Sequence, residues 1–280
     1  MNEKTILITG CSSGIGAALA LALSERGHRV YATARRPDSL QPLADRGLAT
    51  LTLDVNDDAS IAAALATVEA EAGRLDILVN NAGFSQVGAI VDLSREDLRR
   101  QYETNVIAPV AVTRAALPLL RAAVAQQGTA VIGNIGSIVG TFTTPFAGAY
   151  CSSKAAMHSL SDALRMELAP LGIHVVTVQP GGIRSSFGDH AEEGLRLPDD
   201  SLYKSVEKGV RARAQAGQQG ATPAGEFVQP VADALLSDNP PIVVRGGTNS
   251  VRLPLLKKLL PARRFDALMA KNFGLDRLKA

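Results

Sequence analysis

The sequence predicts an α/β protein built as a single doubly wound domain, with about seven parallel strands and helices on both faces of the sheet. Short apolar runs alternate with longer segments of helical periodicity along the 280 residues, which is the pattern of a parallel sheet with crossover helices. Hydrophobic residues make up 46% of the chain and charged residues 20%, so the chain can bury a large core. No shift in composition marks a linker, which favours one domain over two.

The predicted strands are short runs of apolar and β-branched residues bounded by polar or glycine-containing segments. These runs lie at residues 5–9, 29–34, 48–54, 75–80, 130–136, 174–179 and 241–246. Their near-continuous apolar character, rather than a strict alternation, is typical of strands that are covered on both faces.

The predicted helices are longer segments in which apolar side chains recur at helical spacing. They lie at residues 14–26, 57–72 and 94–127, and from Tyr150 to about residue 170. Pro109 and Pro118 predict a bend or an interruption in the third of these helices, because proline has no N–H to donate. The irregular, charge-rich segment 185–225 is predicted to be a substrate loop or lid.

The C-terminal segment has a different charge balance from the rest of the chain. Residues 249–280 carry eight Lys or Arg against two Asp, whereas residues 1–248 form the predicted α/β domain. Two interpretations stay open: a helical tail packed on the domain or on a partner subunit, and an amphipathic segment on an anionic membrane surface. Pro254 and Pro261 interrupt the helical pattern, which favours packing over one continuous membrane helix.

Composition limits the remaining classes of function. The formal net charge of +2 is too small to predict a nucleic-acid-binding surface, and the four scattered histidines lack the spacing of metal ligands, so we predict neither partner. Cys11 and Cys151 do not suggest a disulfide framework, which fits a reducing cytoplasm. The N-terminus has no signal-peptide pattern, and the absence of a run of about 18 apolar residues predicts no membrane-spanning helix.

A glycine-rich turn follows the first predicted strand. The stretch TGCSSGIG, residues 9–16, ends that strand and opens a helix. Gly10 allows a tight turn, and Gly14 and Gly16 let the backbone approach a pyrophosphate at the helix N-terminus, where free N–H groups attract anions. The position predicts a dinucleotide-binding turn, with a plain glycine-rich turn as the alternative.

The end of the second predicted strand favours one dinucleotide. A carboxylate there would accept hydrogen bonds from an adenosine ribose and repel a 2′-phosphate, but no acid lies near Ala34, and Arg35 and Arg36 follow. Guanidinium groups bind phosphate, so we predict NADP(H) rather than NAD(H), with two solvated arginines as the alternative. Asp54, after the third strand, and NNAG, residues 80–83, lie at the same predicted edge, where they could contact the adenine and a ribose.

Two residues of a later helix suggest proton transfer. Tyr150 and Lys154 share one helix face, so the ammonium group could lower the pKa of the phenol and let it exchange a proton with an alcohol or a carbonyl. Ser137, after the fifth strand, could bond the same substrate oxygen, and Asn105 could act through a bound water. By itself, the Tyr-x-x-x-Lys spacing is a common coincidence, and Cys151 beside it has no evident base, so a packing role is expected for that thiol.

Together and in this order, TGCSSGIG, NNAG, Asn105, Ser137, YCSSK and PGGIRS resemble the motifs of the short-chain dehydrogenase/reductase family, from about residue 4 to residue 245. The resemblance implies a Rossmann fold and an NADP-dependent oxidoreductase with Tyr150 as general acid/base. It further implies that Lys154 holds the nicotinamide ribose and lowers the pKa of Tyr150, that Ser137 polarises the carbonyl, and that Asn105 supports a proton-relay water. The implied cofactor-binding residues are Gly10, Ser12, Ser13, Gly14, Ile15, Gly16, Arg35, Arg36, Asp54, Val55, Asn81, Ala82, Gly83, Asn105, Tyr150, Lys154, Pro180, Gly181, Ile183 and Ser185.

The resemblance has two departures and some finer implications. Ser185 stands where the family commonly has threonine, and Ser13 where some members have a basic residue. VYATARRPDSL and the C-terminal segment are similar to a subgroup of retinol dehydrogenase-like, 17-beta-hydroxysteroid dehydrogenase-like and acyl-dihydroxyacetone-phosphate reductase-like enzymes. That similarity implies a small hydrophobic carbonyl or alcohol substrate, and family members usually form homodimers or homotetramers. Phe142, Phe146 and Phe187 could line an apolar pocket or fill the core.

An alternative from another class is a non-catalytic NADP(H)-binding sensor on the same fold. Such proteins tend to lose the tyrosine or the lysine, whereas this chain keeps both Tyr150 and Lys154. The sequence therefore favours the enzyme, and turnover of a carbonyl compound separates the two.

Overall fold

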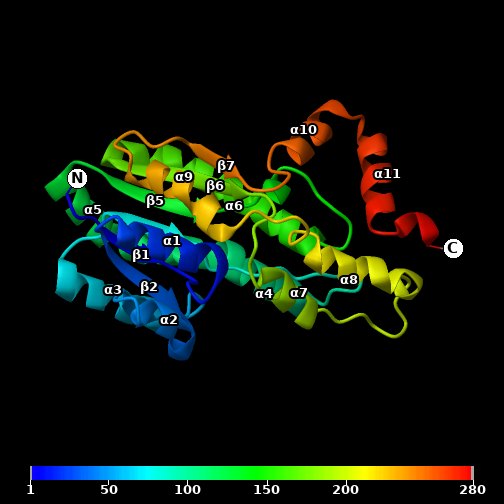
Figure 1. Ribbon diagram of the computed structural model, residues 1–280, viewed down its shortest axis with the longest axis horizontal. Helices are drawn as coiled ribbons and strands as arrows, with labels where there is room; N and C mark the ends of the chain where they lie inside the picture. The colour runs from blue at the N-terminus through cyan, green and yellow to red at the C-terminus, as the bar shows by residue number, and fades with distance from the viewer. Residues whose placement is uncertain (1, 279–280) are drawn as a thin grey trace.

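In a computed structural model, which describes residues 2–278, one sheet has the strand order β3-β2-β1-β4-β5-β6-β7, and every neighbouring pair is parallel (Figure 1). The strands are β1 (Thr5–Ile8), β2 (Arg29–Ala34), β3 (Ala49–Thr52), β4 (Ile77–Asn80), β5 (Ala130–Ile135), β6 (Ile173–Pro180) and β7 (Val243–Gly246). This confirms the predicted α/β domain with a doubly wound sheet. The chain reverses its winding direction between β1 and β4, which is where open sheets of this type bind ligands.

Helices cover both faces of the sheet. One layer holds α1 (Gly14–Glu25) and α9 (Ala224–Leu236), and the other holds α3 (Asp58–Ala72), α5 (Ala108–Gln127) and α6 (Gly148–Leu168) (Figure 1). Alternate residues of a strand point to opposite faces. Accordingly, Ile6 and Ile8 of β1 belong to the core under α1 and α9, and Leu7 to the core under α3 and α5. The strand sequences are continuous apolar runs because side chains on both faces of the sheet are buried in a core.

The remaining helices are shorter, and several were not predicted. They are α2 (Gln41–Ala44), α4 (Arg95–Tyr102), α7 (Phe187–Glu193), α8 (Glu207–Gln215), α10 (Arg252–Leu259) and α11 (Ala262–Asn272). The segment 185–225, predicted to be irregular, therefore contains α7 and α8. Both helices are rich in charge, and their few apolar residues, such as Val210 and Ala214, pack in a separate small core with Phe146. α9 was also absent from the predicted elements.

The helix predicted at residues 94–127 is interrupted just before Pro109 but continues through Pro118. A π-helical turn at Glu103–Ile107 separates α4 from α5, and Pro118 remains inside α5. By length and composition alone, the combined stretch Arg95–Gln127 is long and apolar enough to cross a membrane. Half of its apolar window is buried inside the domain. That burial is the pattern of a core helix packed on a sheet.

Both helices of the tail pack against the domain, but only the second one buries side chains fully. α10 buries no residue, whereas α11 buries Phe265 and Met269 against Ile138 and Phe142. The rings of Phe142 and Phe265 meet edge to face, with their centroids 5.9 Å apart. α11 therefore packs beside the carboxyl end of β5, on the side of the molecule opposite to the N-terminus (Figure 1).

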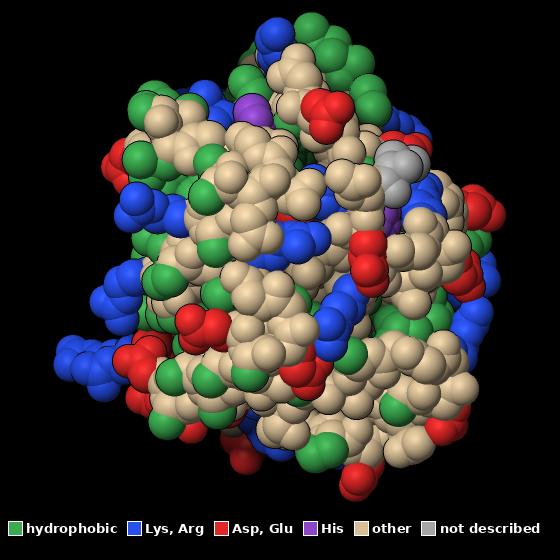
Figure 2. Space-filling view, turned by 90° about the vertical axis from the view of Figure 1, so that its left-hand side faces the viewer, with side chains coloured by type: hydrophobic (Ala, Val, Ile, Leu, Met, Phe, Trp, Pro, Cys, Tyr) green, Lys and Arg blue, Asp and Glu red, His purple; other side chains and the backbone are tan. Residues whose placement is uncertain are grey.

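The end of the molecule that carries the N-terminus has a mixed surface. Figure 2 shows Lys and Arg scattered among Asp and Glu on this face, with no large patch of one sign. The amino ends of the strands lie here, so the ligand-binding edge expected for such a sheet lies at the other end.

Candidate active site

One large cleft runs along the carboxyl ends of the strands. It brings together nearly all the predicted site residues: Gly10, Ser12, Ser13, Gly14, Ile15, Arg35, Arg36, Asp54, Val55, Asn81, Ala82, Gly83, Ser137, Tyr150, Lys154, Pro180, Gly181, Ile183 and Ser185. They come from the ends of six strands and from the start of α6. This convergence follows from the parallel sheet, which places every strand end at one edge.

Two predicted residues lie behind the cleft wall. At Gly16, a Cβ atom would meet the side-chain amide of Asn81 and would lie 2.6 Å from the Gly10 carbonyl oxygen. Asn105, in the π-helical turn, accepts from Phe84 N at 3.1 Å and donates to Phe84 O at 3.0 Å and Ser153 Oγ at 3.2 Å. Both amide hydrogens of Asn105 are therefore used inside the protein, so its side chain has no donor left for a water.

The glycine turn is held in place by the NNAG segment. Gly10 has a φ of +72°, and Asn81 Nδ2 donates to the carbonyl oxygens of Thr9 and Gly10, both at 2.8 Å. Asn81, predicted as a cofactor ligand, thus uses its amide to brace the turn. Ser13 is the N-cap residue of α1, but its side chain accepts no hydrogen bond from the helix. The first N–H groups of α1, which lie at the cleft, are therefore left free by Ser13 to bind an anion.

Replacing Gly10 by alanine should destabilise the protein beyond the cost of a left-handed backbone. A Cβ at Gly10 would lie 2.7 Å from Ala82 Cα, whereas Gly27, at φ +85°, has open space around its Cβ position. Gly27→Ala should therefore cost only the backbone term, about 1–2 kcal/mol, and Gly10→Ala more. Urea unfolding measures both. Equal losses in the two variants would contradict the close approach at Ala82.

The end of β2 presents two exposed arginines to the cleft. Ala34 is buried, and Arg35 and Arg36 follow it into solvent. Among the described residues, neither guanidinium forms an ion pair within 4.0 Å. Asp54, across the cleft, accepts from Asn56 N at 3.0 Å. This end of the cleft can therefore attract an anion through two cations that no neighbouring carboxylate neutralises.

At the other end of the cleft lie Ser137, Tyr150 and Lys154. Lys154 is only 6% exposed, its Nζ donates to the Ile135 carbonyl oxygen at 2.7 Å, and it lies 5.9 Å from the centroid of the Tyr150 ring. Ser137 follows β5 and faces the same space. A phenol, a hydroxyl and an ammonium group therefore meet in a partly enclosed site.

Burial dominates the titration of this cluster. It raises the pKa of Tyr150 to about 12, although the Ser137 hydroxyl and, more weakly, the Arg213 guanidinium favour the phenolate. Burial also lowers the pKa of Lys154 to about 8. The predicted lowering of the Tyr150 pKa by Lys154 is therefore wrong for the protein without ligands. The phenol keeps its proton at neutral pH.

Sequence reasoning missed His158, which supports Ser137. His158 Nε2 accepts from Ser137 N at 3.4 Å, and burial, followed by the charge of Lys154, lowers the pKa of His158 to about 4. The imidazole is thus neutral and can accept. Gly140 leaves room for the ring, since a Cβ there would lie 2.7 Å from Nδ1. Tyr150, Lys154 and His158 recur every fourth residue on one helix face, a signal that could have revealed it.

The aromatic residues and the cysteines divide between pocket and core. Phe142 and Phe187 line the cleft, and Phe187 lies against Tyr150 with a centroid distance of 5.7 Å. Phe146 belongs to the small core around α8. Both cysteines are buried free thiols, and burial raises the pKa of Cys11 to about 12, which makes that thiol a poor nucleophile. Within residues 2–278, no cluster of three His, Cys, Asp or Glu could hold a metal ion.

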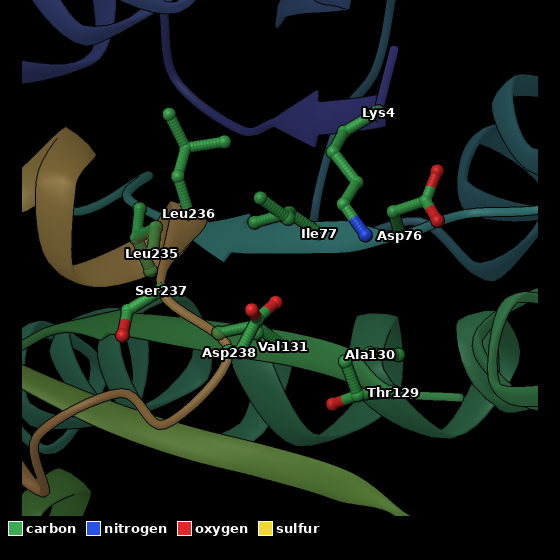
Figure 3. Close-up of a pocket in the computed structure, with 10 residues that line it drawn as sticks. All are labelled: Lys4, Asp76, Ile77, Thr129, Ala130, Val131, Leu235, Leu236, Ser237 and Asp238. Atoms are coloured by element: carbon green, nitrogen blue, oxygen red, sulfur yellow. The ribbon is translucent and has the colours of Figure 1, made fainter. Parts of the chain in front are cut away.

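A second, small pocket lies at the opposite edge of the sheet. Figure 3 shows Lys4 and Asp76 on one side of it and Thr129 and Asp238 on the other. Asp76 accepts from Thr5 N at 2.7 Å and from Arg74 Nε at 3.1 Å. None of the predicted site residues lines this pocket, so it plays no part in the candidate site.

Comparison with known proteins agrees with this geometry. A family model described as short chain dehydrogenase matches residues 4–195. A short-chain dehydrogenase/reductase of Pestalotiopsis microspora is 36% identical over 279 residues, covering 98% of this chain and 95% of its own. A solved short-chain dehydrogenase from Streptomyces avermitilis superposes with a TM-score of 0.78 at 30% identity, covering 99% of this chain and 97% of its own. The closed form of a serine dehydrogenase complexed with NADP+ has a TM-score of 0.73 at 28% identity, covering 87% and 94%. The chain therefore belongs to the short-chain dehydrogenase family of oxidoreductases.

Proposed function

We propose that this protein uses NADPH to reduce a carbonyl group on a small molecule with an apolar body, and that it catalyses the reverse oxidation of the alcohol. The observation that carries the proposal is that Ser137, Tyr150 and Lys154 lie at one end of the same cleft that holds the glycine turn and, at its other end, Arg35 and Arg36. A long ligand can thus span from an anion-binding helix N-terminus to a proton donor.

The cleft has the features that a dinucleotide needs. Gly10 and Gly14 let the turn lie close against Ala82 and Ser185, where a Cβ would collide, and the start of α1 supplies N–H groups for a pyrophosphate. Arg35 and Arg36 would hold a 2′-phosphate, which is the reason for proposing NADP(H). The serine dehydrogenase of similar fold carries NADP+. When bound, the nicotinamide supplies or accepts a hydride.

Tyr150 would handle the proton. Because its pKa is raised, the phenol is protonated at neutral pH and can donate to the oxygen of a carbonyl as that oxygen gains negative charge. Ser137 would donate a second hydrogen bond to the same oxygen. Lys154, held by the Ile135 carbonyl, would place its positive charge where the phenolate develops. The protonation state favours the direction of reduction at neutral pH.

Part of the substrate end of the cleft is apolar. The apolar side chains that line it are Ile138, Phe142, Phe187, Leu253, Met269 and Phe273. Leu253, Met269 and Phe273 come from the tail, so the tail would close over the substrate. An apolar body fits this surface because its burial releases water from carbon on both sides.

Turnover of a carbonyl compound tests the proposal against a non-catalytic sensor. The protein is mixed with NADPH and a panel of aliphatic and aromatic aldehydes and ketones, and NADPH consumption is followed by absorbance. We expect reduction of at least one compound. Tight NADPH binding with no turnover by the protein across the panel would favour the sensor instead.

The two directions should differ in their dependence on pH. Alcohol oxidation needs the phenolate, and the Tyr150 pKa is raised, so oxidation at saturating NADP+ should rise from pH 7 to pH 9, by up to about tenfold per unit. Carbonyl reduction needs the phenol, which stays protonated over this range, so Tyr150 imposes no fall on it. Steady-state rates in both directions measure this. A maximal oxidation rate at pH 7 would contradict a Tyr150 phenol that is protonated at neutral pH.

The assembly and location of the protein are further parts of the proposal. The π-helical turn that leads into α5, and α6 itself, present apolar side chains to solvent: Ile107 of the turn is 51% exposed, and Met166 of α6 is 62% exposed. We propose that these helices join copies into a dimer or tetramer that works in the cytoplasm. Sedimentation velocity decides the first point, since a monomer at micromolar concentration would refute it.

A further inference from the structure

Arg213 on α8 is a buried cation in the wall of the cleft. Its residue is 9% exposed, and its Nε donates to Thr144 Oγ1 at 2.7 Å. Its guanidinium carbon lies 5.9 Å from the centroid of the Phe273 ring, from the C-terminal tail. Thr144 therefore contacts one edge of the planar guanidinium group, and Phe273 contacts one of its faces.

The charge of Arg213 has no counterion among residues 2–278. No carboxylate lies within 4.0 Å of it, and its terminal nitrogens donate to no described acceptor. A nitrogen that was both sealed from solvent and without a hydrogen-bond partner would be a buried unsatisfied donor, and the terminal nitrogens of Arg213 are not of that kind. They are therefore accessible to solvent, which reaches them through the cleft that Arg213 lines. Taking a guanidinium out of water is costly unless an anion replaces the lost water.

Arg213 lies at the substrate end of the cleft. Its positive charge acts on the Tyr150 phenol, and its partner Thr144 also lines the cleft. The proposed site for the 2′-phosphate of the dinucleotide is at the other end, where Arg35 and Arg36 follow β2. Of the nearby ionisable groups in the cleft wall, His190 and Glu193 are both exposed, and neither pairs with Arg213.

We propose that Arg213 binds an anionic group of the substrate, a carboxylate or a phosphate, while the carbonyl of the same molecule lies at Tyr150. This deepens the proposed reductase function and rests on it. The substrate is then an amphipathic anion, whose apolar part contacts Phe187 and the tail residues and whose charged part meets the free edge of the guanidinium. Arginine suits this task because its parallel N–H groups match the oxygens of either anion.

Paired substrates test this inference. One pair is an aliphatic oxo acid and its methyl ester, and the other is a hydroxyketone phosphate and its unphosphorylated parent. In each pair, the carbon skeleton and the carbonyl are the same, and only the charge differs. We expect wild-type protein to prefer one of the two anions over its neutral partner by about tenfold or more in kcat/KM, the size of one charge-assisted hydrogen bond. The pair that shows the preference identifies the anion.

Arg213→Gln should remove that preference. It should lower kcat/KM for the anion to about the value that the same variant shows for the neutral partner, so that the ratio between the two compounds falls to about one. Arg211→Gln is the matched control, because Arg211 lies on the same helix but pairs with Glu207 outside the cleft. A preference that survives Arg213→Gln, or a wild-type protein without any preference, would overturn the inference.

A merely structural role for Arg213 makes a different prediction. If it only anchors the tail through Phe273, then Phe273→Leu should abolish the anion preference as Arg213→Gln does. If Arg213 binds the anion, Phe273→Leu should keep the preference, and Arg213→Lys, which keeps the charge, should retain part of it. If Arg213→Gln does not fold, the anion preference is measured with Arg213→Lys instead.

Binding measurements separate this inference from the proposed function. The same pairs are titrated by calorimetry into wild-type protein and Arg213→Gln, both loaded with NADPH. Tighter binding of the anion to wild-type protein only, without turnover of any compound, would support the anion site and refute the reductase. Turnover of neutral carbonyls with equal binding of anion and ester would support the reductase and refute the anion site.

Discussion

Tyr150→Phe should reduce the rate of carbonyl reduction by about a thousandfold while NADPH binding stays nearly unchanged. The substitution removes only the phenolic oxygen, which is the one group in the cluster that is both protonated at neutral pH and close to Ser137. The ring remains, so its contact with Phe187 and the wall of the cleft should persist. Single-turnover kinetics with NADPH and a reducible carbonyl measure the rate, and fluorescence titration measures NADPH affinity.

A matched control for this experiment is Tyr102→Phe. Tyr102 ends α4 and does not line the cleft, so loss of its hydroxyl should leave turnover unchanged. Full activity of Tyr150→Phe would end the assignment of Tyr150 as the proton donor. Loss of both activity and NADPH binding would point to a collapsed site rather than a missing proton.

Removing both arginines after β2 should convert a protein that prefers NADPH into one that does not. The double variant Arg35→Ala with Arg36→Ala should bind NADPH about 10- to 100-fold more weakly, since charge-assisted hydrogen bonds to a phosphate are lost. NADH has no 2′-phosphate, so its affinity should change little. Titration of both dinucleotides at two ionic strengths measures the ratio, and the wild-type preference for NADPH should shrink as salt rises.

The tail supplies the control pair for this variant. Arg263 and Arg264 are also adjacent and exposed, but they lie on α11 outside the cleft wall. Replacing both by alanine should leave the ratio of NADPH to NADH affinity unchanged. If the variant at residues 35 and 36 kept its ratio as well, the choice of dinucleotide would have to come from another part of the cleft.

Much of the site could be predicted because a parallel sheet converts order in the sequence into position in space. Gly10, Asp54 and Ser137 follow β1, β3 and β5, so knowing the strands was enough to place them at one edge. Tyr150 and Lys154 share a face through helical spacing alone. The roles assigned to these residues remain predictions, but their convergence is a property of the fold.

Other parts could not be predicted because their signals were weak or absent. α7 and α8 are short and charged, and their apolar residues find partners only in a small core that includes Phe146. Asn105 has an ordinary helical neighbourhood in the sequence, and only the π-helical turn and its bonds to Phe84 show that its side-chain donors are spent. The pKa of Tyr150 depends on burial, which no spacing between two residues reveals.

By itself, the sequence determined the strands, the edge at which their polar ends gather, and the family, because apolar periodicity and short motifs are local properties of the chain. Only the tertiary structure decided which charges are buried and what faces them. Arg213 is an ordinary basic residue of a polar helix until Thr144 and Phe273, from distant parts of the chain, close around it. Burial and the cost of an unpaired charge arise from such long-range contacts, so they exist only in the folded molecule.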